Sequence, residues 1–147
     1  MAKTMSDIEY LQAQIPDFKG YLDEISRHQT DQRVRAWVGS TLADVQQRLA
    51  GKLEPDAAKA LEATIFRCQF PDQIFTTRLD VADVDADVAR GLAQADRALV
   101  ELANRASLAD APELPAILSE FSVAFDRRRQ RAPQPPEVEP EAVPPIS

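Results

Sequence analysis

A regular apolar repeat between Asp80 and Ala106 constrains this chain more than any other feature. Apolar residues recur there every three or four positions, the spacing that places them on one face of an α-helix. Asp80 as N-cap, Asp83 in the first turn and Arg105 in the last turn all suit the helix dipole. We therefore predict one helix of about 26 residues, roughly 39 Å long, along which shorter helices pack. The repeat consists of Val81, Val84, Val88, Leu92, Ala95, Leu99, Leu102 and Ala106.

Length and composition predict a single all-α domain. A chain of 147 residues with 44% hydrophobic residues can bury a core without disulfides or metals. Glycine is scarce, alanine is abundant, and no alternating run of β-branched residues predicts a strand. The single cysteine, Cys68, excludes an internal disulfide and a cysteine-based zinc site.

The N-terminal part predicts a short helix followed by the start of a longer one. Ser6 and Glu9 form a capping-box pattern, and Pro16 ends the short helix because the residue before proline avoids the α region. Pro16 also suits the first turn of the next helix. We expect that helix to bury one apolar face, which consists of Phe18, Tyr21, Leu22 and Ile25.

A polar stretch from Ser26 to Arg33 contains no apolar residue and leaves two alternatives open. Either one long helix crosses solvent there, or the helix breaks and restarts with Thr30 as its N-cap. The helical period resumes at Val34 and runs to Leu49. Gly51 then occupies the C′ position, where glycine adopts left-handed backbone angles at low cost.

Two prolines mark the starts of the remaining main helices. Pro55 begins a helix whose core face comprises Ala58, Leu61, Ile65 and Cys68, and residues 71–79 form a further short helical turn. Pro115 stands at N1 of the last helix, since a proline deeper inside would lose a backbone hydrogen bond. The buried face of that helix consists of Leu114, Ile117, Leu118, Phe121, Ala124 and Phe125.

The last sixteen residues differ in character from the rest of the chain. Residues 132–147 hold six of the eleven prolines, three glutamates and no basic residue. Such a segment cannot form a helix or bury enough surface to offset the entropy of ordering. The sequence therefore predicts a four-helix bundle with a short N-terminal helix in residues 1–131, and a disordered acidic tail in residues 132–147.

Charge and hydropathy narrow the classes of partner. A net charge of −7 argues against binding to nucleic acid or to anionic membranes. No apolar stretch approaches the length of a membrane span, and no apolar signal region follows the first residues. We therefore expect a cytoplasmic protein. Thirteen arginines against four lysines are typical of a GC-rich bacterial genome.

No residues in the sequence assemble a catalytic, cofactor or metal site. Asp80, Asp83, Asp85 and Asp87 lack the glycine and the ligand spacing of a calcium loop, so we interpret them as helix-capping residues. His28 is the only histidine, and we expect it to be solvated. No carboxylate is marked by an apolar setting that would raise its pKa. There is no glycine-rich phosphate loop and no nucleophile elbow. We expect no cofactor and no catalytic residue.

The favoured function is therefore non-enzymatic: a helical interaction or scaffolding module that binds a protein partner or itself. The alternative is a bundle with an inter-helix pocket that binds or converts a small molecule. The candidate partner-binding residues are Trp37, a possible interface hot spot, and the basic cluster Arg127, Arg128, Arg129 and Arg131 at the end of the last helix. The alternative pocket would lie near Tyr21, His28, Trp37 and Cys68.

One segment resembles a known group of proteins. The run Ile15-Pro16-Asp17-Phe18-Lys19-Gly20-Tyr21 is similar to one near the start of small uncharacterised bacterial helical proteins. In those proteins an Ile-Pro-x-aromatic-x-Gly-Tyr run opens a charged helix, and the resemblance covers residues 11–49. Their helices are more densely basic than the stretch from Ser26 to Arg35. The resemblance implies a helical fold and carries no activity.

Overall fold

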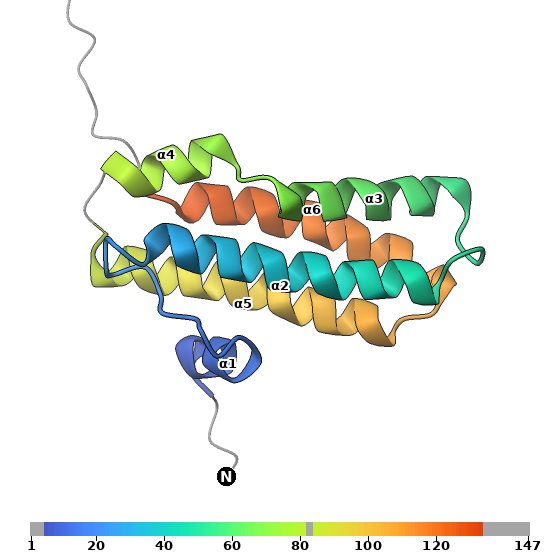
Figure 1. Cartoon of the computed structure of the whole chain (residues 1–147), viewed down its shortest axis with the longest axis horizontal. Coiled ribbons are helices and arrows are strands. Elements are labelled where there is room, and N and C mark those ends of the chain that lie inside the picture. The colour runs from blue at the N-terminus through green and yellow to red at the C-terminus, as the bar shows by residue number, and fades with distance from the viewer. Residues whose placement is uncertain (1–4, 82–83, 134–147) are drawn as a thin grey trace, which may run out of the picture.

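The chain folds into an all-α bundle, as its periodicity predicts (Figure 1). The computed structural model describes residues 5–81 and 84–133. Within these residues the chain forms six α-helices, one short 3-10 helix and no strand. The helices are α1 (Asp7–Gln14), α2 (Arg27–Arg48), α3 (Pro55–Gln69), α4 (Gln73–Val81), α5 (Ala86–Leu108) and α6 (Leu114–Arg131), with the 3-10 helix η1 at Ala111–Glu113.

Four long helices make up the bundle and two short ones lie at its edges. α2 packs against α3 and α5, and α6 packs against α5 and α3, so the four axes lie at the corners of a square. α2 and α5 run in one direction while α3 and α6 run in the other (Figure 1). α4 continues beyond the end of α3 and leads the chain towards α5, and α1 packs across α5. No helix in the described part of the chain combines the length and apolar character needed to cross a bilayer.

Several predicted helix boundaries are confirmed. The Ser6 hydroxyl accepts a hydrogen bond from the Glu9 amide at the start of α1, and Pro55 begins α3. Gly51 has a φ of +78° just after α2, which an L-residue rarely adopts, although it stands one position later than C′. Pro115 lies in the first turn of α6.

The predicted start of the longest helix at Asp80 is wrong. α5 begins at Ala86, and the Asp85 side chain accepts a hydrogen bond from the Val88 amide as its N-cap. Asp80 belongs instead to α4, while Asp83 lies outside the described residues. The apolar period runs through both helices without a glycine or proline between them, so the spacing alone does not mark the break.

From Leu92 onwards the predicted core face of that helix is confirmed. Leu92, Leu99 and Ala106 are completely buried, and Ala95 and Leu102 are 8% exposed. The apolar face of α6 is buried as predicted, and so are Leu61, Ile65 and Cys68 of α3. Ala58, which the pattern assigned to the core, is exposed, and its neighbour Ala57 is buried instead.

The predicted helix over Phe18–Ile25 does not form. The backbone between α1 and α2 is irregular, and Gly20 adopts a φ of +82°. Phe18 and Tyr21 are buried, whereas Leu22 and Ile25 are 61% and 90% exposed. The two aromatic rings are therefore buried as predicted, although from an irregular segment that contains a left-handed glycine and not from a helix.

The polar stretch after it is a single helical segment that does not cross solvent. α2 begins at Arg27 and continues through Thr30 without a break. Arg27, Thr30 and Asp31 are all at least 93% buried. The Thr30 hydroxyl donates to the Gly20 carbonyl at 2.8 Å, so this turn of α2 is tied to the irregular segment before it.

Arginine side chains satisfy carbonyl groups at the C-terminal ends of neighbouring helices. The last four carbonyls of an α-helix have no partner within the helix and carry partial negative charge. A guanidinium group from another helix meets both needs, which gives the many arginines a structural role. The donors and acceptors are Arg27 to Leu79 O in α4, Arg35 to Cys68 O in α3, Arg48 to Ala106 O and Ala109 O at α5, and Arg78 to Arg129 O in α6.

Candidate functional site

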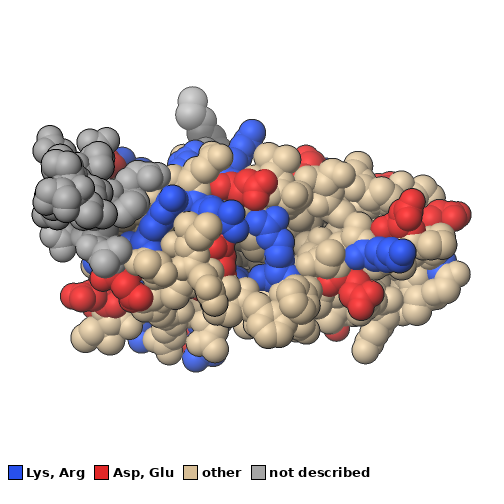
Figure 2. All heavy atoms as spheres, turned by 90° about the horizontal axis from the view of Figure 1, so that it is seen from above, with Lys and Arg blue, Asp and Glu red and all other residues tan. Residues whose placement is uncertain are grey.

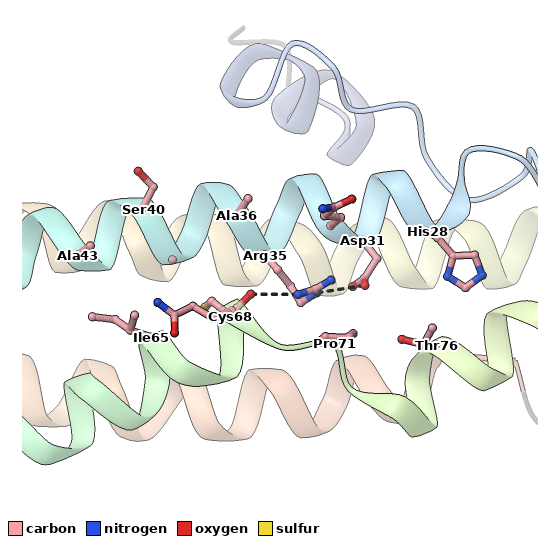
Figure 3. Close-up of a pocket in the computed structure, with 13 residues that line it drawn as sticks. His28, Asp31, Arg35, Ala36, Ser40, Ala43, Ile65, Cys68, Pro71 and Thr76 are labelled. Carbon is pink, nitrogen blue, oxygen red and sulfur yellow. Dashed lines mark hydrogen bonds and ion pairs between the residues drawn. The ribbon is translucent and has the colours of Figure 1, made fainter.

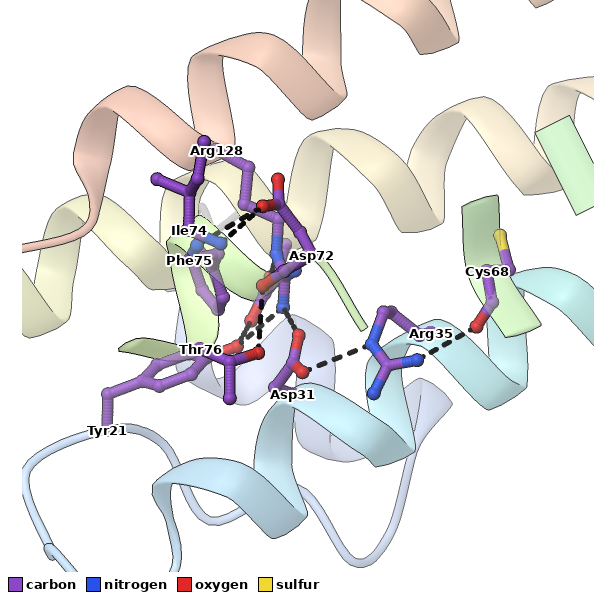
Figure 4. Close-up of polar contacts among 10 residues, drawn as sticks. Tyr21, Asp31, Arg35, Cys68, Asp72, Ile74, Phe75, Thr76 and Arg128 are labelled. Atoms are coloured by element: carbon purple, nitrogen blue, oxygen red, sulfur yellow. Dashed lines mark hydrogen bonds and ion pairs between the residues drawn. The ribbon is translucent and has the colours of Figure 1, made fainter. Parts of the chain in front are cut away.

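A buried network of charged residues lies at one end of the bundle core (Figure 4). At its centre is Arg128 of α6, which is 3% exposed. Its Nε donates to Asp96 Oδ1 at 2.7 Å, and its Nη2 lies 2.7 Å from Asp31 Oδ1 and donates to the Tyr21 hydroxyl at 3.1 Å. The guanidinium also stacks on the Phe75 ring, 4.2 Å from its centroid. The network therefore links α2, α4, α5 and α6 to the segment before α2.

The network holds a carboxylate that sequence reasoning missed. We predicted no carboxylate in an apolar setting, yet Asp96 is completely buried on the apolar face of α5 between Leu92 and Leu99. Burial raises the pKa of Asp96 and outweighs the opposing effect of Arg128. Burial also raises the pKa of Tyr21, which stays protonated and donates to Asp96 Oδ2 at 2.5 Å. The sequence did contain a signal for this burial, because Asp96 falls on the same helix face as Leu92 and Leu99.

A second arginine, Arg35, connects the network to α3. Its Nε donates to Asp31 Oδ2 at 3.1 Å and its Nη1 donates to the Cys68 carbonyl at 3.0 Å. Within the described part of the chain its Nη2 has no hydrogen-bond partner. Asp31 Oδ1 likewise accepts no hydrogen bond of good geometry from a described residue, although Arg128 Nη2 is close to it.

A pocket of about 640 Å³ opens beside Asp31 and Arg35, and we call it the α2–α3–α4 pocket (Figure 3). Small side chains on α2, among them Ala36 and Ser40, leave this space against α3. The two helices pack closely at Gly39, where an added Cβ would come within 2.9 Å of the Cys68 Cβ. Asp31 and Arg35 both line this pocket.

The structure brings together only some of the residues predicted for a pocket. His28 and Cys68 line the α2–α3–α4 pocket, whereas Tyr21 lies in the buried network and half-buried Trp37 packs against the core. His28 is not simply solvated, because its Nε2 lies 2.5 Å from Asp80 Oδ1, with both side chains largely exposed. Burial raises the pKa of Cys68 to about 11 despite nearby arginines, so its thiol is a poor nucleophile.

The predicted basic cluster does not form one surface patch. Arg128 is buried, and Arg129 is bound to Asp72 at 2.6 Å. Arg127 and Arg131 are exposed. The four side chains point in different directions around α6, so their environments differ. The sequence spacing alone, about 100° per residue, contained this signal.

Large apolar side chains are exposed together where α3 meets α4. Phe66, Phe70 and Ile74 are 60%, 55% and 49% exposed, and the two phenyl rings lie 4.6 Å apart. We call these three residues the aromatic surface. They border a hollow of about 430 Å³. Phe66 and Phe70 fall outside the Leu61–Ile65–Cys68 stripe of α3, so their exposure was readable from the sequence.

Paired charges surround the aromatic surface. Arg67 Nη2 lies 3.2 Å from Asp126 Oδ1, and Arg129 holds Asp72 on the other side of the hollow. Figure 2 views the bundle from the side of α3 and α4 and shows acidic and basic side chains interleaved with uncharged surface. The rim is therefore polar without a single dominant sign of charge.

Comparison with known protein families, with curated proteins and with solved structures finds no match for this chain. Among residues 5–81 and 84–133, no three His, Cys, Asp or Glu side chains gather closely enough to hold a metal ion. The two features with the most evident binding capacity are thus the aromatic surface and the α2–α3–α4 pocket.

Proposed function

We propose that this chain is a non-enzymatic, cytoplasmic helical module that binds a protein partner through the aromatic surface. The observation that supports this proposal is the joint exposure of Phe66, Phe70 and Ile74 on one corner of the bundle. Phenylalanine and isoleucine are among the most often buried residues, and a cluster of them at the surface marks an interaction site. A single buried, unpaired cysteine suits a reducing compartment.

The geometry favours a partner segment that inserts apolar side chains. The hollow beside the aromatic surface is large enough for one or two such side chains. Each half-exposed phenyl ring that a partner covers would contribute roughly 2–3 kcal/mol, at about 25 cal/mol per Å² of apolar surface. Arg67 and Arg129 are already paired with carboxylates on this chain. The polar rim would therefore orient the partner and form hydrogen bonds with it, and would contribute little net electrostatic attraction.

A double variant, Phe66→Ser with Phe70→Ser, tests this proposal. Both side chains are already more than half exposed, so the variant should melt within a few degrees of the native chain. The matched control is Leu108→Ser, which removes an 88% exposed leucine from the opposite end of the bundle. Tagged versions of the three chains would be used to capture proteins from a lysate of the source organism, with identification by mass spectrometry.

We expect native and Leu108→Ser chains to retain the same partner and the double variant to lose it. Equal recovery by all three chains would contradict a role for the aromatic surface. Sedimentation of the purified chains checks self-association in parallel. A dimer that dissociates in the double variant alone would identify a second copy of this chain as the partner.

A further inference from the structure

Two arginines without a carboxylate partner line a groove of about 700 Å³ between α5 and α6, which we call the α5–α6 groove. Within the described part of the chain, the Arg127 side chain forms no ion pair or hydrogen bond, and Arg131 Nη1 donates to the uncharged Gln94 Oε1 at 2.8 Å. Both arginines are exposed and stand one helical turn apart, so they lie along the same wall of the groove. The aromatic surface does not border this groove, so its role is independent of the proposed function.

The other charged side chains of the α5–α6 groove are already paired. Glu101 Oε1 lies 2.7 Å from Arg97 Nε, and Glu120 Oε2 lies 2.9 Å from Arg105 Nη2. These pairs leave the groove with a surplus of positive charge, although the chain as a whole has a net charge of −7. A surplus of this sign attracts an acidic segment.

The α5 wall of the groove is apolar and made of small side chains. Ala95, Ala98 and Leu102 line it at spacings of three and four residues, which place them on one face of α5. Val123 of α6, which is 49% exposed, also borders the groove. An occupant therefore needs an acidic side that faces Arg127 and Arg131 and an uncharged side that faces α5.

The acidic tail that the sequence predicts has this two-sided pattern. It follows α6 directly, and residues 134–147 lie outside the described part of the chain. Glutamates occupy positions 137, 139 and 141, and the residues between them are uncharged. Because side chains alternate between the two sides of an extended chain, the glutamates share one side and the uncharged residues share the other.

The spacing and the length of the tail also match the groove. Arg127 and Arg131 lie about 6 Å apart along α6, and Glu137 and Glu139 lie about 6.6 Å apart in an extended chain. Five residues separate Arg131 from Glu137, which is enough for a reversal of direction, since a β-turn takes four. Residues 134–147 can span about 43 Å at 3.1 Å per residue, whereas α6 is only about 27 Å long.

We propose that residues 137–142 of this chain dock in the α5–α6 groove as an extended segment. Glu137 and Glu139 pair with Arg131 and Arg127, and the uncharged residues between the glutamates lie against Ala98. The tail cannot order by itself, so the docking is reversible and depends on salt. A short tether gives an effective concentration in the millimolar range. With an intrinsic Kd on the order of 1 mM, about half of the molecules hold the tail in the groove.

The amide chemical shifts of Glu137 and Glu139 in a ¹⁵N–¹H spectrum of the full-length chain test this proposal. The test variant combines Arg127→Gln with Arg131→Gln. The matched control combines Lys52→Gln with Lys59→Gln, which removes two charges from exposed residues near the start of α3. Spectra are recorded in about 10 mM and about 1 M salt, between which the Debye length falls from about 30 Å to about 3 Å.

We expect native and lysine-variant chains to share the same tail shifts in low salt. In the arginine variant these amides should move in low salt to the positions that the native chain shows in high salt, because the docked half of the population is lost. Unchanged tail amides in the arginine variant, or equal changes in both variants, would overturn the proposal. Low-salt shifts that depend on chain concentration would place the tail of a second copy in the groove and would also overturn it.

Discussion

Replacement of Arg128 by methionine should be among the most destabilising single changes in this bundle. The side chain provides the cation for Asp96 and Asp31, which are completely and 97% buried. Arg128→Met keeps much of the apolar stem and removes that cation. Loss of one partner from a buried ion pair leaves an uncompensated charge and costs about 3–5 kcal/mol. Small domains have a total stability of only about 5–15 kcal/mol.

Urea denaturation followed by circular dichroism measures this effect. With a urea m-value of about 1–3 kcal/mol per M, the midpoint should fall by between about 1 and 5 M. Arg127→Met is the matched control, since that neighbour is exposed and should change stability by less than about 0.5 kcal/mol. Equal midpoints for the two variants would refute the conclusion that the buried network holds the helices together.

The pH dependence of Arg128→Met provides a second, independent readout. Burial already raises the pKa of Asp96, and Arg128 opposes that rise. Without Arg128 the folded-state pKa of Asp96 rises further above its unfolded value of about 3.9. A folded state that binds more protons than the unfolded state loses stability as pH increases. As the pH falls from 7 towards that unfolded value, the variant should therefore recover stability relative to the native chain.

Three further predictions concern the core and its edges. Leu99→Ala should cost about 2–5 kcal/mol in a thermal or urea melt, because it opens a cavity at a completely buried position. At pH 8 the Cys68 thiol, with a pKa of about 11, should react with a disulfide reagent about 100-fold more slowly in the folded than in the urea-unfolded chain. Partial burial raises the pKa of Asp72, but hydrogen bonds from Arg129 and from two backbone amides outweigh this effect and lower the pKa below its usual value. Its contribution to stability is present above about pH 4 and lost as pH falls through the lowered value, so Asp72→Asn should flatten the acid limb of the stability curve by up to about 1 kcal/mol.

Local sequence signals identified most helices because they act through neighbouring residues. Ser6, Pro55 and Pro115 mark helix starts through capping and proline geometry, and Gly51 marks an end through its positive φ. These effects depend on residues within one turn of the chain. The N-cap prediction failed at Asp80. Asp80 and Asp85 both precede apolar residues of one continuous helical period, so the sequence does not distinguish them, and only the folded structure places Asp80 inside α4 and Asp85 at the start of α5.

The candidate sites depend on residues that are far apart in the sequence. Arg128 meets Asp31 and Tyr21 across about a hundred positions, and Arg35 meets the Cys68 carbonyl across thirty-three. A polar residue is predicted to be exposed unless its partner is known. The burial of Asp31 therefore could not be predicted from residues 26–33 alone. The aromatic surface is different, since Phe66 and Phe70 lie off the apolar stripe of α3.

The sequence by itself determined that this chain is a helical bundle, because apolar periodicity and helix caps are local properties. It also determined which leucines of α5 and which residues of α6 form the core. Only the tertiary structure decided that charged residues of α2 lie inside the bundle. The reason is energetic: a buried Asp31 or Asp96 is tolerable only when a guanidinium from another helix compensates it. That compensation is a property of the assembled helices and of no single segment.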